Sequence, residues 1–385
     1  LPQPEKTKDK VLLDERGLLD LPFLALTVLL VLIGVIMVFS ASYARAYYLT
    51  GNSTYYFARQ AIFAVAGIAG MLFVSRLNYQ LWRSASFIIL LVSVFFLMLV
   101  PIIGSTANGA KRWIPLGPVS LQPMEFVKIS LALYLAYFMS SKQALVKTFS
   151  RGVIPPFAVT GLFCGLLLLQ PDFGSAVVVA SILFFMCLAG GTRFIYLFFA
   201  MILSCAGAMA LAILEPYRLR RLLAFLDPFA DPTNTGYHLV QSLLAIGSGG
   251  FFGVGVGASR QKMFYLPEAH NDFIMAVLAE ELGFVGVTVV MLLFGLLFWR
   301  CYRIIMRQTE LRDRLTAFGL TVILAMGAVM NLAVVMGVAP PKGVPMPLMS
   351  YGGSNLMATM LCVGLLMNFS RTATGKEGSI WKESS

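Results

Sequence analysis

Charged residues are scarce in this sequence. Only 12% of its 385 residues are Asp, Glu, Lys or Arg, whereas 58% are hydrophobic. A soluble domain normally carries about twice that charged fraction. The composition therefore excludes a water-soluble globule and makes lipid part of the solvent of this chain.

Metal-binding and disulfide patterns are also missing. The two histidines, His238 and His270, exclude a polyhistidine metal centre. The five cysteines lie in or beside apolar segments and show no CxxC spacing, so neither a disulfide framework nor a zinc site is indicated, and we interpret them as small buried hydrophobes. These cysteines are Cys164, Cys187, Cys205, Cys301 and Cys362.

Long apolar runs are abundant. Most approach the roughly 20 residues that a bilayer crossing needs. Backbone groups in hydrocarbon need partners within their own segment, so each run is predicted to be a helix. The prediction is an all-α integral membrane protein with about ten transmembrane helices, over 22–41, 57–75, 83–103, 124–140, 154–169, 173–190, 193–214, 273–299, 316–339 and 355–370.

The order of these runs predicts the topology of the chain. Residues 1–21 form a polar tail, residues 22–371 a membrane domain, and residues 372–385 a second tail. The first run is too long for a signal-peptide core and is predicted to be retained. Lys and Arg concentrate in the segments that would be cytoplasmic if both tails are cytoplasmic, and this favours that orientation. Most of the basic residues behind the net charge of +11 are therefore interpreted as anchors to lipid headgroups rather than as a nucleic-acid surface.

The predicted outside segments differ from the short, basic inside links. They are rich in Pro, Gly and polar residues, and they include a large extracytoplasmic loop, residues 215–271, between the seventh and eighth spans. Because these irregular segments and their mixed charges lie on one side, we expect the functional site on the external face. The other such segments are 104–128, 169–175 and 339–355.

Two of these segments carry charged residues next to a span. Glu125 and Lys128 lie three residues apart on one helical face, after a Pro suited to a first helical turn. They form either a local ion pair or part of a functional site. Lys111 and Arg112 are either headgroup anchors or substrate contacts. Asp172 either caps a helix or lines a cavity.

The large loop offers candidates for anion binding. It contains Arg218, a predicted short interfacial helix over Leu239–Ile246, and a glycine-rich stretch over 247–257 followed by Arg260 and Lys262. Glycine-rich backbone can cradle phosphate, although a flexible turn is the more common interpretation. Basic residues outside the cell are the ones that topology does not explain, so a dianionic lipid headgroup is the predicted ligand.

Asp272 ends this loop at the start of the next apolar helix. It is either a helix cap or a general base held at the mouth of a cavity. At 100° per residue, Glu280 and Glu281 are rotated roughly 80° and 180° from Asp272, so we expect them to pair within the bundle instead.

A further irregular segment begins at Lys342 and precedes the last span. Two Pro and two Gly break the backbone over 345–355, PMPLMSYGGSN, which includes Ser350 and Tyr351. Such a segment must be buried in protein or line a cavity.

Four motifs, RWIPLGPVSLQPMEFVK, QPDFGSA, YLPEAHNDF with AEELG, and PLMSYGGSN, occur in an order that resembles the SEDS family of cell-wall polymerases from the first span to the last. Within that family the sequence is more similar to division members than to elongation members. The chain departs at Met124, Asn271 and Ala279, where the family commonly has Ser, Thr and Gly, and keeps every charged position.

The resemblance implies a glycosyltransferase that polymerises lipid II, an undecaprenyl-diphosphate-linked disaccharide peptide, outside the cytoplasmic membrane of a bacterium, at the septum. Asp272 falls on the family's essential aspartate and is the expected general base. The expected substrate-binding residues are Lys111, Arg112, Glu125, Lys128, Asp172, Arg218, Arg260, Lys262, Lys342, Ser350 and Tyr351.

The resemblance also implies a partner, a class B penicillin-binding protein transpeptidase, together with other division proteins. No cofactor is required by any motif, although a divalent cation, magnesium or manganese, could bridge a carboxylate and the diphosphate. Two alternatives remain open from the residues alone. One is a transporter that flips lipid II, and the other is a non-catalytic scaffold for a synthase.

Overall fold

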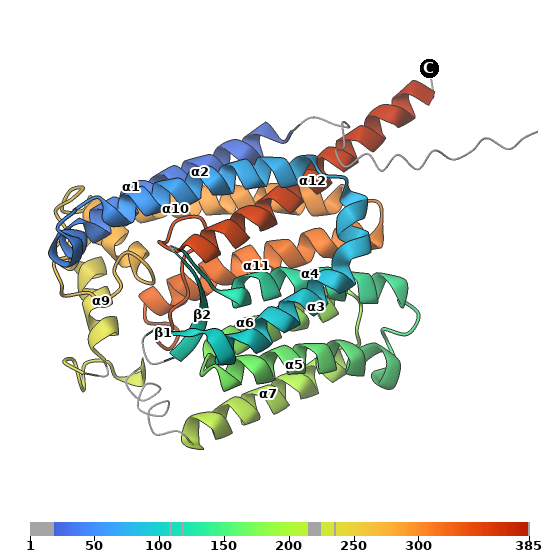
Figure 1. The fold of residues 1–385 in the computed structure, drawn as a ribbon, viewed down its shortest axis with the longest axis horizontal. Coiled ribbons are helices and arrows are strands. Elements are labelled where there is room, and N and C mark those ends of the chain that lie inside the picture. The colour runs from blue at the N-terminus through green and yellow to red at the C-terminus, as the bar shows by residue number, and fades with distance from the viewer. Residues whose placement is uncertain (1–18, 108–109, 118, 215–224, 235, 384–385) are drawn as a thin grey trace, which may run out of the picture.

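The computed structural model describes residues 19–107, 110–117, 119–214, 225–234 and 236–383, and it is a helical bundle with a small sheet at one end (Figure 1). The helices of the first half are α1 (Leu21–Thr50), α2 (Tyr55–Arg76), α3 (Tyr79–Ile103), α4 (Pro123–Ser141), the π-helical turn η1 (Phe149–Val153), α5 (Ile154–Leu169) and α6 (Phe173–Ala189). The second half contains α7 (Phe194–Leu214), α9 (Tyr237–Gly249), α10 (Ile274–Met306), α11 (Leu311–Val335) and α12 (Gly353–Glu383).

Each of the ten predicted spans coincides with one of these helices, so the predicted architecture is confirmed. Within the described chain, seven helical segments are long and apolar enough to cross a membrane, and α6 and α7 contribute shorter apolar stretches. The helix α4 is 19 residues long and carries Glu125 and Lys128 near its start. The start of α1 and the end of α12 lie at the same end of the bundle (Figure 1), as an even number of crossings requires.

Several helices begin where the sequence provides a cap. The side chains of Asp20, Asn78 and Asp172 accept backbone N–H groups in the first turns of α1, α3 and α6. Pro123 is the first residue of α4, where its missing N–H costs no helical hydrogen bond. These caps stabilise helix starts whose N–H groups would otherwise lack acceptors.

The sheet between α3 and α4 was not predicted. Strands β1 (Ser105–Ala107), β2 (Ala110–Leu116) and β3 (Val119–Leu121) form one antiparallel sheet in the order β1-β2-β3. Thr106 pairs with Lys111, and Pro115 pairs with Ser120. Two of the strands have three residues, too few to show an alternating pattern, and the Pro and Gly residues among them are typical of a loop.

The predicted short helix over Leu239–Ile246 exists as α9, but it packs against the bundle. Leu239 is buried beside Gly337, and the Ser242 hydroxyl donates to the carbonyl of Val335 over 2.8 Å. These contacts place α9 against the end of α11, at the same end of the molecule as the sheet (Figure 1).

The glycine-rich stretch after α9 binds protein backbone, which corrects its interpretation as a phosphate cradle. The helix α10 breaks at Gly283, whose φ of 65° and ψ of −164° are not helical. The N–H of Val254 donates to the carbonyl of Glu280, and the carbonyl of Gly250 accepts from the N–H of Phe284, both over 3.0 Å. The stretch thus satisfies backbone groups that the break exposes, as backbone at membrane depth requires.

Candidate functional site

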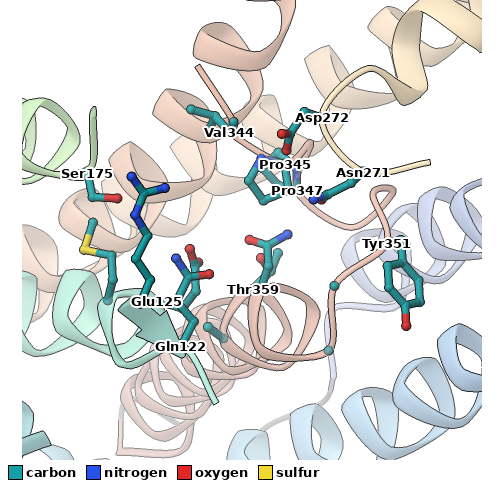
Figure 2. Close-up of a pocket in the computed structure, with 18 of the residues that line it drawn as sticks. Gln122, Glu125, Ser175, Asn271, Asp272, Val344, Pro345, Pro347, Tyr351 and Thr359 are labelled. Carbon is teal, nitrogen blue, oxygen red and sulfur yellow. The ribbon is translucent and has the colours of Figure 1, made fainter. Parts of the chain in front are cut away.

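A cavity of about 460 Å³ opens at the end of the bundle that carries the sheet. Its walls come from α1, α2, β2, β3, α4, α6, α11 and α12, from the segment before α10 and from the segment between α11 and α12. Figure 2 shows Asn271, Asp272 and Pro345 on one side, with Gln122, Glu125 and Thr359 on the other. Segments far apart in the sequence therefore meet here, as predicted from the Pro- and Gly-rich segments that share one side of the membrane domain.

Asp272 lies on the cavity wall just before α10. The N-cap of α10 is Phe273, and no side chain caps that helix, so the interpretation of Asp272 as a helix cap is wrong. Its backbone N–H donates to the carbonyl of Glu268 over 3.1 Å, and its carbonyl accepts from the amide of Asn331 over 2.7 Å. The backbone of Asp272 is thus held from both sides while its carboxylate faces the cavity (Figure 2).

Burial raises the pKa of Asp272 to about 7. The nearby carboxylate of Glu268 raises this pKa further, whereas the cations Lys342 and Arg112 lower it. Burial therefore has the largest effect on this pKa, because the charged carboxylate loses more stabilisation by water than it gains from the two cations. A group with a pKa near 7 is close to half ionised at neutral pH, which suits a general base.

The segment 345–352 supports the residues around Asp272. The Ser350 hydroxyl donates to the carbonyl of Asn271 over 2.6 Å and accepts from the N–H of Met346 over 2.8 Å. The N–H of Tyr351 donates to the carbonyl of His270 over 3.0 Å. Ser350 therefore joins two loops and does not line the cavity, which corrects its prediction as a substrate contact, whereas Tyr351 lines it.

Arg112 and Asp172 face each other on another wall. The Arg112 guanidinium donates to the carbonyl of Pro171 over 2.5 Å, and its Nε lies 3.8 Å from Asp172. Asp172 also accepts hydrogen bonds from the N–H and hydroxyl of Ser175, which caps α6. The two interpretations of Asp172, a helix cap and a cavity residue, are both correct.

Glu125 and Lys128 form the predicted local ion pair, and this pair lies in the cavity wall. Their side chains form an ion pair of 2.6 Å, and both line the cavity. Each is less than one-fifth exposed, so the pair neutralises two charges in a wall with little access to water.

Lys342 is a cavity cation whose pKa is lowered by burial. Burial lowers the pKa of its amine to about 8, Asp172 raises it and Lys128 lowers it. A Cβ atom at Gly174 would collide with the Lys342 side chain, so Lys342 lies directly against the start of α6. This part of the cavity wall therefore brings the cations Arg112, Lys128 and Lys342 together with the carboxylates Glu125 and Asp172.

The Gly174→Ala substitution is expected to displace Lys342 and lower activity without a comparable loss of stability. The added Cβ meets the far end of a flexible side chain, which can move while the backbone stays in place. Loss of one charged hydrogen bond to substrate corresponds to roughly a tenfold to hundredfold decrease in kcat/KM. Turnover and thermal midpoint should be measured together, with Gly161→Ala, which meets open space, as control.

Lys262 does not belong to the cavity, which corrects its prediction as a diphosphate contact. Its amine lies 2.6 Å from Glu281 and 3.1 Å from the Ser40 hydroxyl, and both charged side chains are at most 1% exposed. Glu280 accepts from the N–H of Arg260 over 2.9 Å. As expected from their rotation, both glutamates pair within the bundle and join the large loop to α1 and α10.

Two further predicted residues are not brought to the cavity, and a third is not described by the structure. Lys111 and Arg260 are exposed and do not line it, and Arg218 lies outside the described residues. Sequence reasoning also missed polar and charged residues that do line it, although Glu268 belongs to the motif of Asp272 and Asn355 to the last motif. The missed residues include Arg45, Tyr56, Arg59, Glu268 and Asn355.

Known proteins are similar to this chain over nearly its whole length. The family model FtsW/RodA/SpoVE, described as cell cycle protein, matches residues 21–375. A probable peptidoglycan glycosyltransferase FtsW of Trichlorobacter lovleyi is 43% identical over 353 residues, which cover 91% of this chain and 93% of the relative. Stage V sporulation protein E of Bacillus subtilis is 39% identical over 354 residues, covering 91% and 97%.

Solved structures show the same arrangement. A chain of a peptidoglycan synthase complex, studied for how it coordinates polymerization and crosslinking, superimposes with a TM-score of 0.75 at 29% identity and covers 92% of this chain and 98% of its own. The rod shape determining protein RodA of Thermus thermophilus gives a TM-score of 0.68 at 29% identity, covering 92% and 97%.

Proposed function

Because the chain belongs to the FtsW/RodA/SpoVE family of integral membrane proteins, we propose that it is a peptidoglycan glycosyltransferase that polymerises lipid II at the outer face of the cytoplasmic membrane. One observation carries the proposal. Asp272 faces a cavity with its pKa raised to about 7, and Arg112 and Lys342 lie close enough to influence that pKa. A base and cations in one cavity are the groups that transfer of a sugar from a diphosphate needs.

In the proposed reaction, Asp272 accepts the proton of the 4-hydroxyl of the acceptor sugar. The oxygen then bonds to C1 of the donor sugar, the bond between C1 and the diphosphate oxygen breaks, and undecaprenyl diphosphate leaves with that electron pair. The configuration at C1 inverts. Arg112 and Lys342 stabilise the charge that develops on the leaving group.

A divalent cation, magnesium or manganese, stays a separate proposal. The described chain contains no group of three or more His, Cys, Asp or Glu residues arranged to hold a metal ion. A cation at this site would therefore need oxygens of the diphosphate as ligands in addition to a carboxylate of the cavity wall, and it would help to neutralise the charge of the leaving group.

The activity is expected to depend on pH with two limbs. Since Asp272 must be ionised to act as a base, kcat/KM should rise with pH through about 7. Since Lys342 must be protonated to bind an anion, kcat/KM should fall through about 8. Steady-state polymerisation between pH 5.5 and pH 10 measures both limbs. Lys342→Arg should move only the upper limb, because an arginine stays charged, and an unchanged upper limb would remove Lys342 from the proposal.

The proposal is tested by incubating the purified chain with lipid II, with and without a transpeptidase partner. Glycan strands as product support a polymerase. A chain that moves lipid II between leaflets of a vesicle but forms no strands would be a transporter instead. A chain that does neither and only recruits a synthase would be a scaffold.

Partner and location complete the proposal. The synthase complex that superimposes on this chain couples polymerization to crosslinking, and this supports a class B penicillin-binding protein as partner here. The similarity to FtsW proteins supports action in septal synthesis during division. The even number of spans and the basic short links support a cytoplasmic location for both chain ends.

A further inference from the structure

The first turn of α12 forms part of the cavity wall. Gly352, Gly353 and Asn355 all line the cavity, and α12 continues from there for 31 residues. The first N–H of this helix with a backbone acceptor is that of Leu356, which donates to the carbonyl of Gly352 over 2.9 Å. Within the described part of the chain, the N–H groups of Gly353, Ser354 and Asn355 make no hydrogen bond, so they are available to a ligand, as the first N–H groups of a helix often are.

The side chain of Asn355 is a second, independent indication of a ligand. Asn355 is only 8% exposed, and its Nδ2 has no hydrogen-bond partner among the described residues. A buried donor without an acceptor is costly, so such donors in native proteins usually have a partner or await one. The Nε of Arg112, in the same cavity, also lacks a hydrogen-bond partner in the described part of the chain.

The first turn of α12 is held rigidly. The Ser354 hydroxyl accepts from the N–H of Gln122 and donates to the carbonyl of Ser120, both over 3.0 Å. These bonds join the start of α12 to β3 and α4. A rigid set of donors binds an anion more strongly than a mobile one, because less conformational entropy is lost on binding.

We propose that the first turn of α12, together with the Asn355 side chain, binds a phosphate group of the diphosphate on the lipid-linked donor sugar. Backbone N–H groups at a helix start point at the ligand, and the helix dipole favours negative charge there. The Asn355 amide adds a directed donor, and Arg112 adds a positive charge. This assignment rests on the proposed function, since it identifies the leaving group of that reaction.

The position of this turn fits an inverting displacement. In such a reaction the attacking hydroxyl and the leaving oxygen lie on opposite faces of the sugar carbon, so the base and the leaving-group site must face each other. Figure 2 shows Asp272 on one side of the cavity and Thr359, one helical turn after Asn355, on the other. The acceptor sugar accordingly lies nearer Asp272, and the donor diphosphate lies nearer α12.

Binding is measured with undecaprenyl diphosphate, undecaprenol and inorganic pyrophosphate on the purified full chain in micelles. Asn355→Asp keeps the shape of the side chain but replaces the donor with a negative charge. It is expected to weaken undecaprenyl diphosphate binding by roughly tenfold to a hundredfold, the effect of one charged hydrogen bond, and to leave undecaprenol binding unchanged. Asn52→Asp, the same change at an exposed turn on the external side, is the control.

An unchanged affinity for undecaprenyl diphosphate in Asn355→Asp would overturn the assignment. If that variant does not fold, Asn355→Ser removes the amide without adding charge. It should still weaken the binding of undecaprenyl diphosphate severalfold. Pyrophosphate that binds and shows the same loss identifies the phosphate groups alone as the ligand, whereas a loss seen only with the lipid assigns the site to the lipid-linked form.

Failure of this inference is distinguishable from failure of the proposed function. If the wild-type chain binds the diphosphate through Asn355 but makes no glycan strands, the anion site is supported and the polymerase activity is contradicted. If the wild-type chain polymerises lipid II and Asn355→Asp binds the diphosphate normally, the polymerase activity is supported and this site is contradicted.

Discussion

Replacing Asp272 by Asn is expected to slow polymerisation of lipid II by about 10²–10⁴-fold, the contribution of a positioned general base. Asparagine has nearly the same shape as aspartate but cannot accept the proton of the acceptor hydroxyl. The bonds that hold this residue, from its own N–H to Glu268 and from Asn331 to its carbonyl, involve only its backbone and are retained. The loss should therefore appear in kcat with little change in diphosphate binding.

The measurement compares wild type, Asp272→Asn and Asp227→Asn by separating glycan products at equal protein and lipid II concentrations. Asp227 is an exposed carboxylate of the same loop, so its substitution controls for the general effect of removing a negative charge. Equal polymerisation by wild type and Asp272→Asn would show that another group is the base. No polymer from either, even with the transpeptidase partner, would favour a transporter or a scaffold.

Replacing Lys262 by Met is expected to lower the free energy of unfolding by about 3–5 kcal/mol, the typical cost of removing one partner from a buried ion pair. Among the described residues, Glu281 would keep only the Ser40 hydroxyl as partner of its charge, in a site where neither Lys262 nor Glu281 is more than 1% exposed. Reversible unfolding in mixed micelles measures this change. Because this pair joins the large loop to α1 and α10, lipid II turnover should fall as well.

A second variant separates the charge effect from packing. Lys262→Met combined with Glu281→Leu removes both charges, and it should recover much of the lost stability, since an apolar pair often replaces a buried ion pair at little cost. Lys111→Met is the control, because Lys111 is exposed on β2 and its loss should change stability by no more than about 0.5 kcal/mol. A double variant as unstable as Lys262→Met alone would mean that packing, not charge, is responsible.

The helices could be predicted from the sequence because their cause is local. A run of about 20 apolar residues must be helical in lipid whatever surrounds it. The helix starts at Pro123 and Asp172 are equally local, since a proline or a capping side chain acts within one turn. The strands β1 and β3 could not be predicted in this way, because three residues pair only when a partner strand is present.

The candidate site divides in the same manner. Asp272, Glu125, Lys128, Asp172 and Lys342 were found because each is a charge beside an apolar run, which is costly unless it has a use or a partner. Lys262 was predicted as a basic residue that follows the glycine-rich stretch, yet the structure pairs it with Glu281 and places it outside the cavity. Arg45 and Arg59 line the cavity from α1 and α2, although nothing in the intervening sequence connects them to Asp272.

By itself, then, the sequence determined that this chain lies in a membrane, that it forms about ten apolar helices, and which segments between them are rich in Pro, Gly and polar residues, because hydrophobicity and helical hydrogen bonding act within a segment. Only the tertiary structure decided which charges share a cavity, that the pKa of Asp272 rises to about 7, and that Asp272 and the start of α12 line the same cavity. Those properties depend on burial and on distances between helices, which are set by packing across the whole bundle.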